Sequence, residues 1–255
     1  MNTNRLNIRK LMATVCVAAT AAGFTLPAHA VDYDPSVDYM KLMIIAAANG
    51  DTAALSEAAE CRNAKIEGMN LSYAPVTSME LLQNFEACAG FSLQKDYMAE
   101  IVECCKTGDY DHGVDAAQKR NRKITLLGLE YTKFTYDEFC TLAKIIHNEA
   151  GSSWLPMEWK MAVGEVVLNR VASSKFPNNI YDVVHQRGQY AGANSSRFAS
   201  MTPSDGCIQA AVNLMNGERV FNDTRVLYQA NFRQGNGVAR AMYDSTLGTT
   251  YFCYG

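Results

Sequence analysis

The hydrophobic pattern of the first half of the chain predicts repeated helical hairpins. Residues 38–66 repeat at 96–124, a spacing of 58 residues, with 11 of 29 positions identical. Each copy predicts a helix, a Gly-Asp turn and a second helix, because glycine accommodates the left-handed residue that ends a helix and aspartate caps the next one. Between the copies, a further amphipathic helix is predicted around Ser78–Cys88. We expect an all-α helical-hairpin repeat domain over residues 31–134.

The pattern changes after Tyr136. Apolar side chains at Phe139, Leu142, Ala143 and Ile146 follow helical spacing and predict a helix over 136–150. A second helix is predicted over 157–172, with Trp159, Val163, Val166 and Val167 as its inner face. A short helix over 180–185, a loop or short strand over 187–200 and a helix from 205 to about 216 follow. Strands are predicted at 226–228 and 249–253. We expect an α+β domain over residues 135–255, mostly helical, with a small β-sheet.

Residues 1–30 have the organisation of a signal peptide. Arg5, Arg9 and Lys10 precede an uncharged run of 16 residues from Leu11 to Leu26, and Ala28-His29-Ala30 follows as a cleavage pattern. A retained N-terminal anchor is the alternative, but the run is shorter than the roughly 20 residues that span a bilayer. We therefore expect a secreted protein with no membrane span.

Charge and cysteine content narrow the partners further. The 255 residues contain 23 Lys and Arg against 26 Asp and Glu; without residues 1–30 the balance is 20 − 26 = −6. This acidic balance disfavours nucleic acid as a partner. Seven cysteines remain after residue 30, an odd number, in no C-x-x-C or Cys/His arrangement. We expect no metal and no cofactor, and buried, small hydrophobic roles for most of these cysteines.

Glu149 is the candidate for chemistry. It extends the apolar stripe that includes Leu142 and Ile146, which predicts a carboxylate on the core-facing side of a helix, in its last turn. Partial burial and the negative end of the helix dipole both disfavour the anion, so both are expected to raise the pKa of Glu149. A carboxyl group that stays protonated can donate its proton to a leaving oxygen. The alternative is a helix-end glutamate that points into water without a catalytic role.

Four blocks of this part of the chain support the catalytic interpretation. They are Leu142–Gly151, Met161–Val171, Phe176–Val184 and Gln186–Tyr190. Together they resemble, in the same order, the catalytic domain of the SleB/CwlJ family of cell-wall hydrolases, the spore-cortex-lytic enzymes and their relatives. The resemblance extends over about Tyr136–Phe252 and leaves the helical repeats outside.

The resemblance implies a lysozyme-like fold that cleaves the glycan strand of peptidoglycan between MurNAc and GlcNAc, with Glu149 as the catalytic acid. Relatives resemble lytic transglycosylases, in which one glutamate is both acid and base. Gln189 and Tyr190 match a block that lines the family's substrate cleft, with Tyr in place of Phe.

Two more aromatic residues, Tyr228 and Phe252, match family positions expected to contact substrate, with core packing as the alternative. Two other acids of this region, Glu165 and Asp182, are interpreted as surface residues.

Two other functions stay open. One is an N-acetylmuramoyl-L-alanine amidase that cuts the peptide stem. The other is a catalytically inactive cell-wall-binding protein, favoured by Ser152-Ser153 and Thr250, which depart from the family pattern. The repeats are expected either to bind a protein partner or to act as a spacer.

Overall fold

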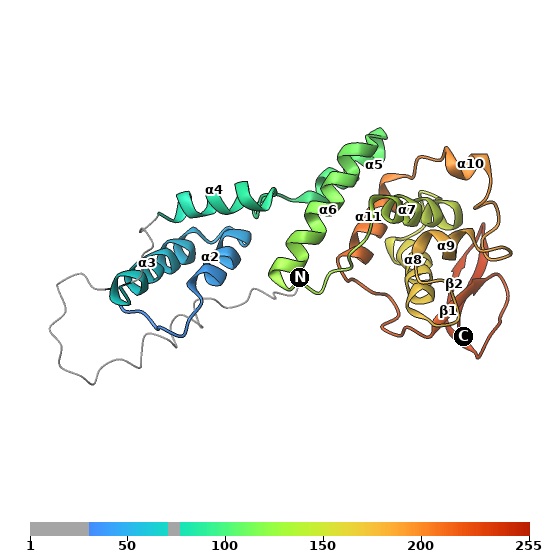
Figure 1. The fold of residues 1–255 in the computed structure, drawn as a ribbon. Coiled ribbons are helices and arrows are strands. Elements are labelled where there is room, and N and C mark those ends of the chain that lie inside the picture. Colours follow the sequence, from blue (N-terminus) through green and yellow to red (C-terminus); the bar gives the residue numbers. More distant parts are fainter. Residues whose placement is uncertain (1–30, 71–76) are drawn as a thin grey trace. The chain divides into compact units, whose positions relative to one another are not determined.

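The computed structural model describes residues 31–70 and 77–255 (Figure 1). The predicted signal peptide over residues 1–30 lies outside the described residues. Within them the chain forms ten helices and one three-stranded antiparallel sheet, which confirms the expected α+β, mostly helical fold class. The described residues divide into two compact units, one that ends at Lys95 and one over Asp96–Gly255. No helix of the described ranges is long and apolar enough to cross a membrane.

The first unit contains the first copy of the repeat and the helix that follows it. Helix α2 (Tyr39–Ala48) and α3 (Thr52–Gly68) form a hairpin, and α4 (Ser78–Ala89) packs on both. Asp51 caps α3 by accepting a hydrogen bond from the backbone of Ala54, and Gly50 before it has a φ of +66°. The Gly-Asp turn therefore works as the sequence predicted.

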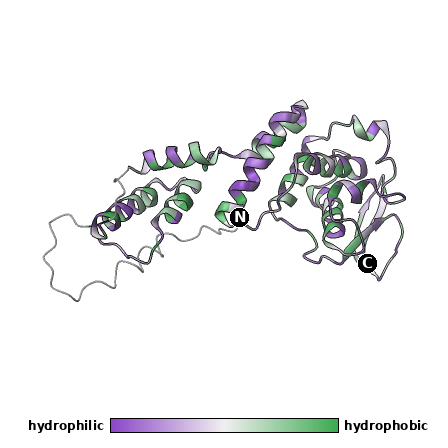
Figure 2. Cartoon of the chain, in the orientation of Figure 1, coloured by the Kyte–Doolittle hydropathy of each residue, from purple (hydrophilic) through white to green (hydrophobic). Residues whose placement is uncertain are grey.

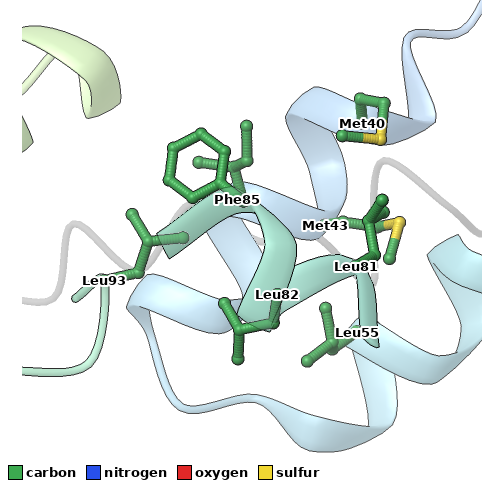
Figure 3. A pocket seen from close by; sticks show the side chains of 8 residues that line it. Met40, Met43, Leu55, Leu81, Leu82, Phe85 and Leu93 are labelled. Carbon is green, nitrogen blue, oxygen red and sulfur yellow. The ribbon is translucent and has the colours of Figure 1, made fainter. Parts of the chain in front are cut away.

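Apolar side chains from these three helices meet in the core of the first unit. They surround a small hollow whose walls carry only carbon and sulfur in their side chains (Figure 3). Its lining consists of Met40, Met43, Ile44, Leu55, Leu81, Leu82, Phe85 and Leu93. Because no polar group lines it, the hollow reflects packing between helices, and it offers no groups for catalysis.

The second unit begins with the second copy of the repeat, α5 (Tyr97–Thr107) and α6 (Tyr110–Leu127). Gly108 again has a positive φ, +80°, and Asp109 caps α6. Both copies are therefore helix–turn–helix hairpins, as predicted. Figure 2 shows hydrophobic and hydrophilic positions alternating along these helices, which is the pattern of helices buried on one side.

The α5–α6 hairpin is tied to the rest of the second unit by Arg120. This side chain is buried, and its guanidinium donates to the carbonyl oxygens of Thr132 and Met215 and to the side chain of Asn216, at 2.9–3.1 Å. The sequence placed the domain boundary near residue 135, whereas the compact units divide between Lys95 and Asp96. Whether residues 135–255 form a domain without this hairpin stays a prediction.

The remaining elements are helices that pack around α8 and a sheet that α8 contacts through β1. They are α7 (Tyr136–Ala150), α8 (Met157–Ala172), α9 (Ile180–His185), α10 (Ser196–Ala199), α11 (Asp205–Met215), β1 (Val226–Ala230), β2 (Val238–Asp244) and β3 (Gly248–Tyr254). The strand order is β1-β3-β2. The sequence did not predict β2, an edge strand in which Met242 is the one buried position and no regular apolar alternation occurs. It also did not predict the single turn of α10.

Helix α8 is the centre of the second unit. It packs against α7, α11, α9 and β1, and 11 of its residues are buried, including the predicted inner face. Gly164 makes this contact possible, since a Cβ there would lie 2.5 Å from Leu214 and 2.7 Å from Ile146. The close packing fixes α7, and therefore Glu149 at its end, relative to the sheet.

All seven cysteines after residue 30 are free thiols in the structure. Cys61, Cys104, Cys207 and Cys253 are buried, which confirms the expected role as small hydrophobic residues for most of them.

Candidate active site

Glu149 lies where the apolar stripe of α7 leaves the core. Ile146, one turn earlier, is completely buried, whereas Glu149 is exposed to solvent. The expectation that this carboxylate faces the core is therefore wrong. The helix ends at Ala150, so the last step of the stripe reaches the surface of the unit. A residue at the surface can be reached by a substrate, as an acid catalyst requires.

The surroundings of Glu149 nevertheless disfavour its charged form. Protein atoms crowd the carboxyl group on the sides that do not face solvent, and this loss of hydration raises the pKa of Glu149 above its ordinary value. Hydrogen bonds from Asn148, at 2.8 Å, and from Gln229 of β1 act in the opposite direction, as does the charge of Arg170. Loss of hydration outweighs them. The predicted direction of the shift is confirmed, in an exposed group.

The helix dipole contributes less than the sequence suggested. Lys160 of α8 is buried, and its ammonium group donates to the carbonyl oxygens of Ala150, Ser152 and Leu155 at 2.7–3.2 Å. A cation at the end of α7 offsets the negative end of that helix. It also fixes the backbone of residues 150–155, which lead away from Glu149.

Arg170 of α8, whose charge acts on Glu149, is held in place by one hydrogen bond and three aromatic rings. Its Nε donates to the carbonyl oxygen of Leu227 at 2.7 Å, and its side chain is 3% exposed. The guanidinium carbon lies 5.0 Å from the ring centres of Phe176 and Tyr190 and 5.9 Å from that of Tyr228. These contacts are typical of cation–π packing. The charge is thus held at a fixed position.

Several buried polar atoms around Glu149 have no hydrogen-bond partner. Among the described residues they include Arg170 Nη1, the Tyr190 hydroxyl and Gln229 Oε1, all from residues that act on or contact Glu149 or Arg170. Buried polar atoms are normally paired, and exceptions concentrate at functional sites. The region behind the carboxyl group is therefore polar as well as tightly packed.

The residues predicted to bind substrate fall into two groups. Gln189 is exposed and Tyr228 is half-buried, so both have surface to offer a ligand. Tyr190 is 7% exposed, with Arg170 against its ring, and burial raises its pKa to about 12. Phe252 is fully buried and packs on Phe221 at 5.3 Å between ring centres. The structure places Tyr190 and Phe252 behind the surface, where core packing accounts for them.

Glu165 is not a surface residue, contrary to the sequence-based interpretation. It is 1% exposed, and its carboxylate accepts hydrogen bonds from the backbone N–H groups of Val220 and Phe221. Burial raises the pKa of Glu165, and these two hydrogen bonds oppose the shift. Helical periodicity missed this role because α8 is buried on nearly every side. Asp182 is exposed, as expected, and accepts a hydrogen bond from Asn179.

No group of three or more His, Cys, Asp or Glu side chains in the described ranges is arranged to hold a metal ion. His147, two residues before Glu149, accepts a hydrogen bond from the backbone N–H of Ser204 at 3.1 Å. Partial burial lowers the pKa of His147. This histidine joins α7 to the start of α11.

Asn148, Arg170 and Gln229 were not predicted as site residues, yet they surround Glu149. Asn148 and Arg170 lie inside the sequence blocks that carry the family resemblance, and Gln229 follows Tyr228 directly. Their positions inside these blocks were the sequence clue for Asn148 and Arg170. Only the contact of its side chain with Glu149 in the folded unit identifies Gln229.

Residues 156–252 match a family model described as Cell Wall Hydrolase. The match confirms the resemblance for this C-terminal part and supports a hydrolase that acts on peptidoglycan. It contains Arg170, Gln189, Tyr190 and Gln229, and it begins seven residues after Glu149. No curated protein and no solved structure matches the chain.

Proposed function

We propose that the C-terminal part of this protein cleaves the glycan strand of peptidoglycan between MurNAc and GlcNAc, as a lytic transglycosylase, with Glu149 as its single acid and base. One observation carries the proposal. Glu149 is an exposed residue at the surface of the unit, and burial of its carboxyl group raises its pKa. A general acid needs both access to the substrate and a retained proton.

In the first step, protonated Glu149 donates its proton to the glycosidic oxygen as the bond from that oxygen to the anomeric carbon of MurNAc breaks. Glu149 becomes a carboxylate, and the side-chain amides of Asn148 and Gln229 and the charge of Arg170 stabilise it. In the second step, this carboxylate accepts the proton of the muramic C6 hydroxyl while the hydroxyl oxygen attacks the anomeric carbon. The product is a 1,6-anhydro sugar, and the proton is back on Glu149.

No acid among the described residues shifts the pKa of Glu149, and this supports a single-residue mechanism. A two-carboxylate mechanism uses groups roughly 5–10 Å apart. Among the described residues, the side chains that shift the pKa of Glu149 are Asn148, Gln229 and Arg170, and none is an acid. Glu165 is already engaged with backbone N–H groups at Val220 and Phe221.

Product analysis tests the proposal. Purified peptidoglycan is digested with the full chain, and the released fragments are identified by mass spectrometry. Fragments that end in 1,6-anhydro-MurNAc support a lytic transglycosylase, whereas reducing MurNAc ends indicate simple hydrolysis. Free stem peptides would replace the proposal with an amidase. Binding to peptidoglycan without release of fragments would replace it with an inactive wall-binding protein.

We also propose that residues 1–30 direct export and that the protein acts outside the cell, at the wall. This proposal rests on the sequence pattern of these residues and on the peptidoglycan substrate that the family match implies. A role of the helical hairpins in binding a protein partner stays a prediction.

A further inference from the structure

Arg170 is buried in the second unit in an unusual setting for an arginine. Its guanidinium packs against the rings of Phe176 and Tyr190, both at 5.0 Å, and its Nε is bound to a carbonyl of β1. Its Nη1 is buried and has no hydrogen-bond partner among the described residues. Taking a charged group out of water is unfavourable unless other charges or dipoles compensate. The unfavourable burial of this charge is therefore expected to serve a function.

We propose that Arg170 is a positioning residue for the reaction. Its fixed guanidinium holds β1 and the ring of Tyr190 in place, and its charge stabilises the carboxylate that Glu149 becomes after proton donation. The inference rests on the proposed function of Glu149. It adds a residue that does not touch the reacting atoms and acts through the catalytic group.

The positional part of this role follows from three contacts. Arg170 Nε holds the carbonyl of Leu227, two residues before Gln229, whose side chain binds Glu149. On its other side Arg170 holds Tyr190. The next residue of that loop, Ala191, accepts a hydrogen bond from Asn148 at 3.2 Å. Both amides that contact Glu149 are thus linked to Arg170 through short stretches of backbone.

The electrostatic part follows from the sign of the charges around Glu149. Arg170 lowers the pKa of Glu149, against the larger effect of lost hydration. Tyr190 of the loop after α9 and Tyr228 of β1 are the titratable groups packed on Arg170 itself. His147 on the same helix faces Ser204, and Lys160 faces the carbonyls that follow Glu149. A residue that serves as both acid and base must accept a proton as well as donate one. The charge of Arg170 favours the carboxylate of Glu149, which is the form that accepts the proton.

The test compares Arg170→Gln and Arg170→Lys with the native chain by the pH dependence of kcat/KM for fragment release from peptidoglycan. Loss of the positive charge raises the pKa of Glu149, and the protonated form is the active acid. The fall of kcat/KM at alkaline pH, the alkaline limb, is therefore expected at higher pH in Arg170→Gln than in the native chain. The lysine variant keeps the charge and is expected to keep the limb. Loss of the planar guanidinium is expected to lower kcat in both by about 10- to 100-fold, the scale of a misplaced catalytic group.

Arg120→Gln is the matched control, since it removes another buried arginine of the same unit away from Glu149. It is expected to lower stability and leave the limb unchanged. An unshifted limb in folded Arg170→Gln would overturn the electrostatic role, and native kcat in Arg170→Lys would overturn the positional one. If the glutamine variant does not fold, a carboxyl NMR titration of Glu149 in Arg170→Leu, which removes the charge and leaves no buried polar group, decides the electrostatic role: a raised pKa supports it, and a native pKa overturns it. Activity retained by Glu149→Gln would instead refute the proposed function.

Discussion

The side chain of Gln229 on β1 donates a hydrogen bond to Glu149 at the end of α7, although 80 residues separate the two in the sequence. This contact joins α7 to the sheet at the candidate catalytic group. It exists because α8 packs on both α7 and β1 and fixes their separation. The site is therefore a property of the packed second unit and of no single motif.

Glu149 is expected to reduce stability at neutral pH. Because its pKa is raised in the folded state, the folded chain retains the proton longer than the unfolded chain. Stability is then lost as pH rises from the ordinary carboxyl range through the folded-state pKa. Glu149→Gln is predicted to unfold at a higher temperature than the native chain at pH 7, with the difference shrinking toward pH 3. Thermal unfolding followed by circular dichroism at both pH values measures this. An equal difference at both would contradict it.

Glu165 is expected to be structural. Glu165→Ala leaves the backbone N–H groups of Val220 and Phe221 without their acceptor, and we predict a loss of about 2–4 kcal/mol in the free energy of unfolding. Activity per folded molecule is predicted to stay close to native, because this side chain is buried away from solvent. Urea unfolding together with a fragment-release assay separates the two effects. A large loss of activity in fully folded protein would give Glu165 a part in the chemistry.

Arg120 is predicted to hold the α5–α6 hairpin on the second unit. Arg120→Met removes the donor for two backbone carbonyls and one side chain, and the expected loss is about 2–4 kcal/mol. Arg122→Met, an exposed position of the same helix, is the control and is predicted to change stability by less than about 0.5 kcal/mol. Equal unfolding midpoints for the two variants would mean that the hairpin contributes little to this unit.

Export is predicted to remove residues 1–30. N-terminal sequencing of protein recovered from outside the cell is expected to begin at Val31, after the Ala28-His29-Ala30 pattern. Ala30→Arg is expected to block this cleavage, because the enzyme that removes signal peptides requires a small residue there. Protein that stays with the cells and begins at Met1 would refute the prediction.

Local patterns were sufficient to predict most helices. Helices α7, α8 and α9 have the predicted bounds, and both Gly-Asp turns form as expected, because spacing and capping are properties of neighbouring residues. Strand β2 was missed, since an edge strand with exposed positions has no apolar alternation to recognise.

The candidate site was predictable in part. Sequence identified Glu149 and the direction of its pKa shift, but it placed the side chain in the core and assigned the shift partly to the helix dipole. The structure shows an exposed residue whose carboxyl group is crowded by neighbouring atoms, with Lys160 at the helix end. Arg170 had only its place inside a family-like block as a clue, and the contact of Gln229 joins segments far apart in the sequence, which no local pattern encodes. Glu165 was predicted at the surface because a helix is usually buried on one side, whereas α8 is buried on nearly every side.

The most direct test of the account is the rate at which Glu149→Gln releases fragments from purified peptidoglycan. Asp182→Asn serves as the control, since it replaces another exposed acid of the same unit by its amide. With folding verified by circular dichroism, the account predicts a loss of about 10²- to 10⁴-fold for Glu149→Gln, the usual contribution of a general acid–base group, and a native rate for Asp182→Asn. Release by Glu149→Gln at the native rate would contradict it.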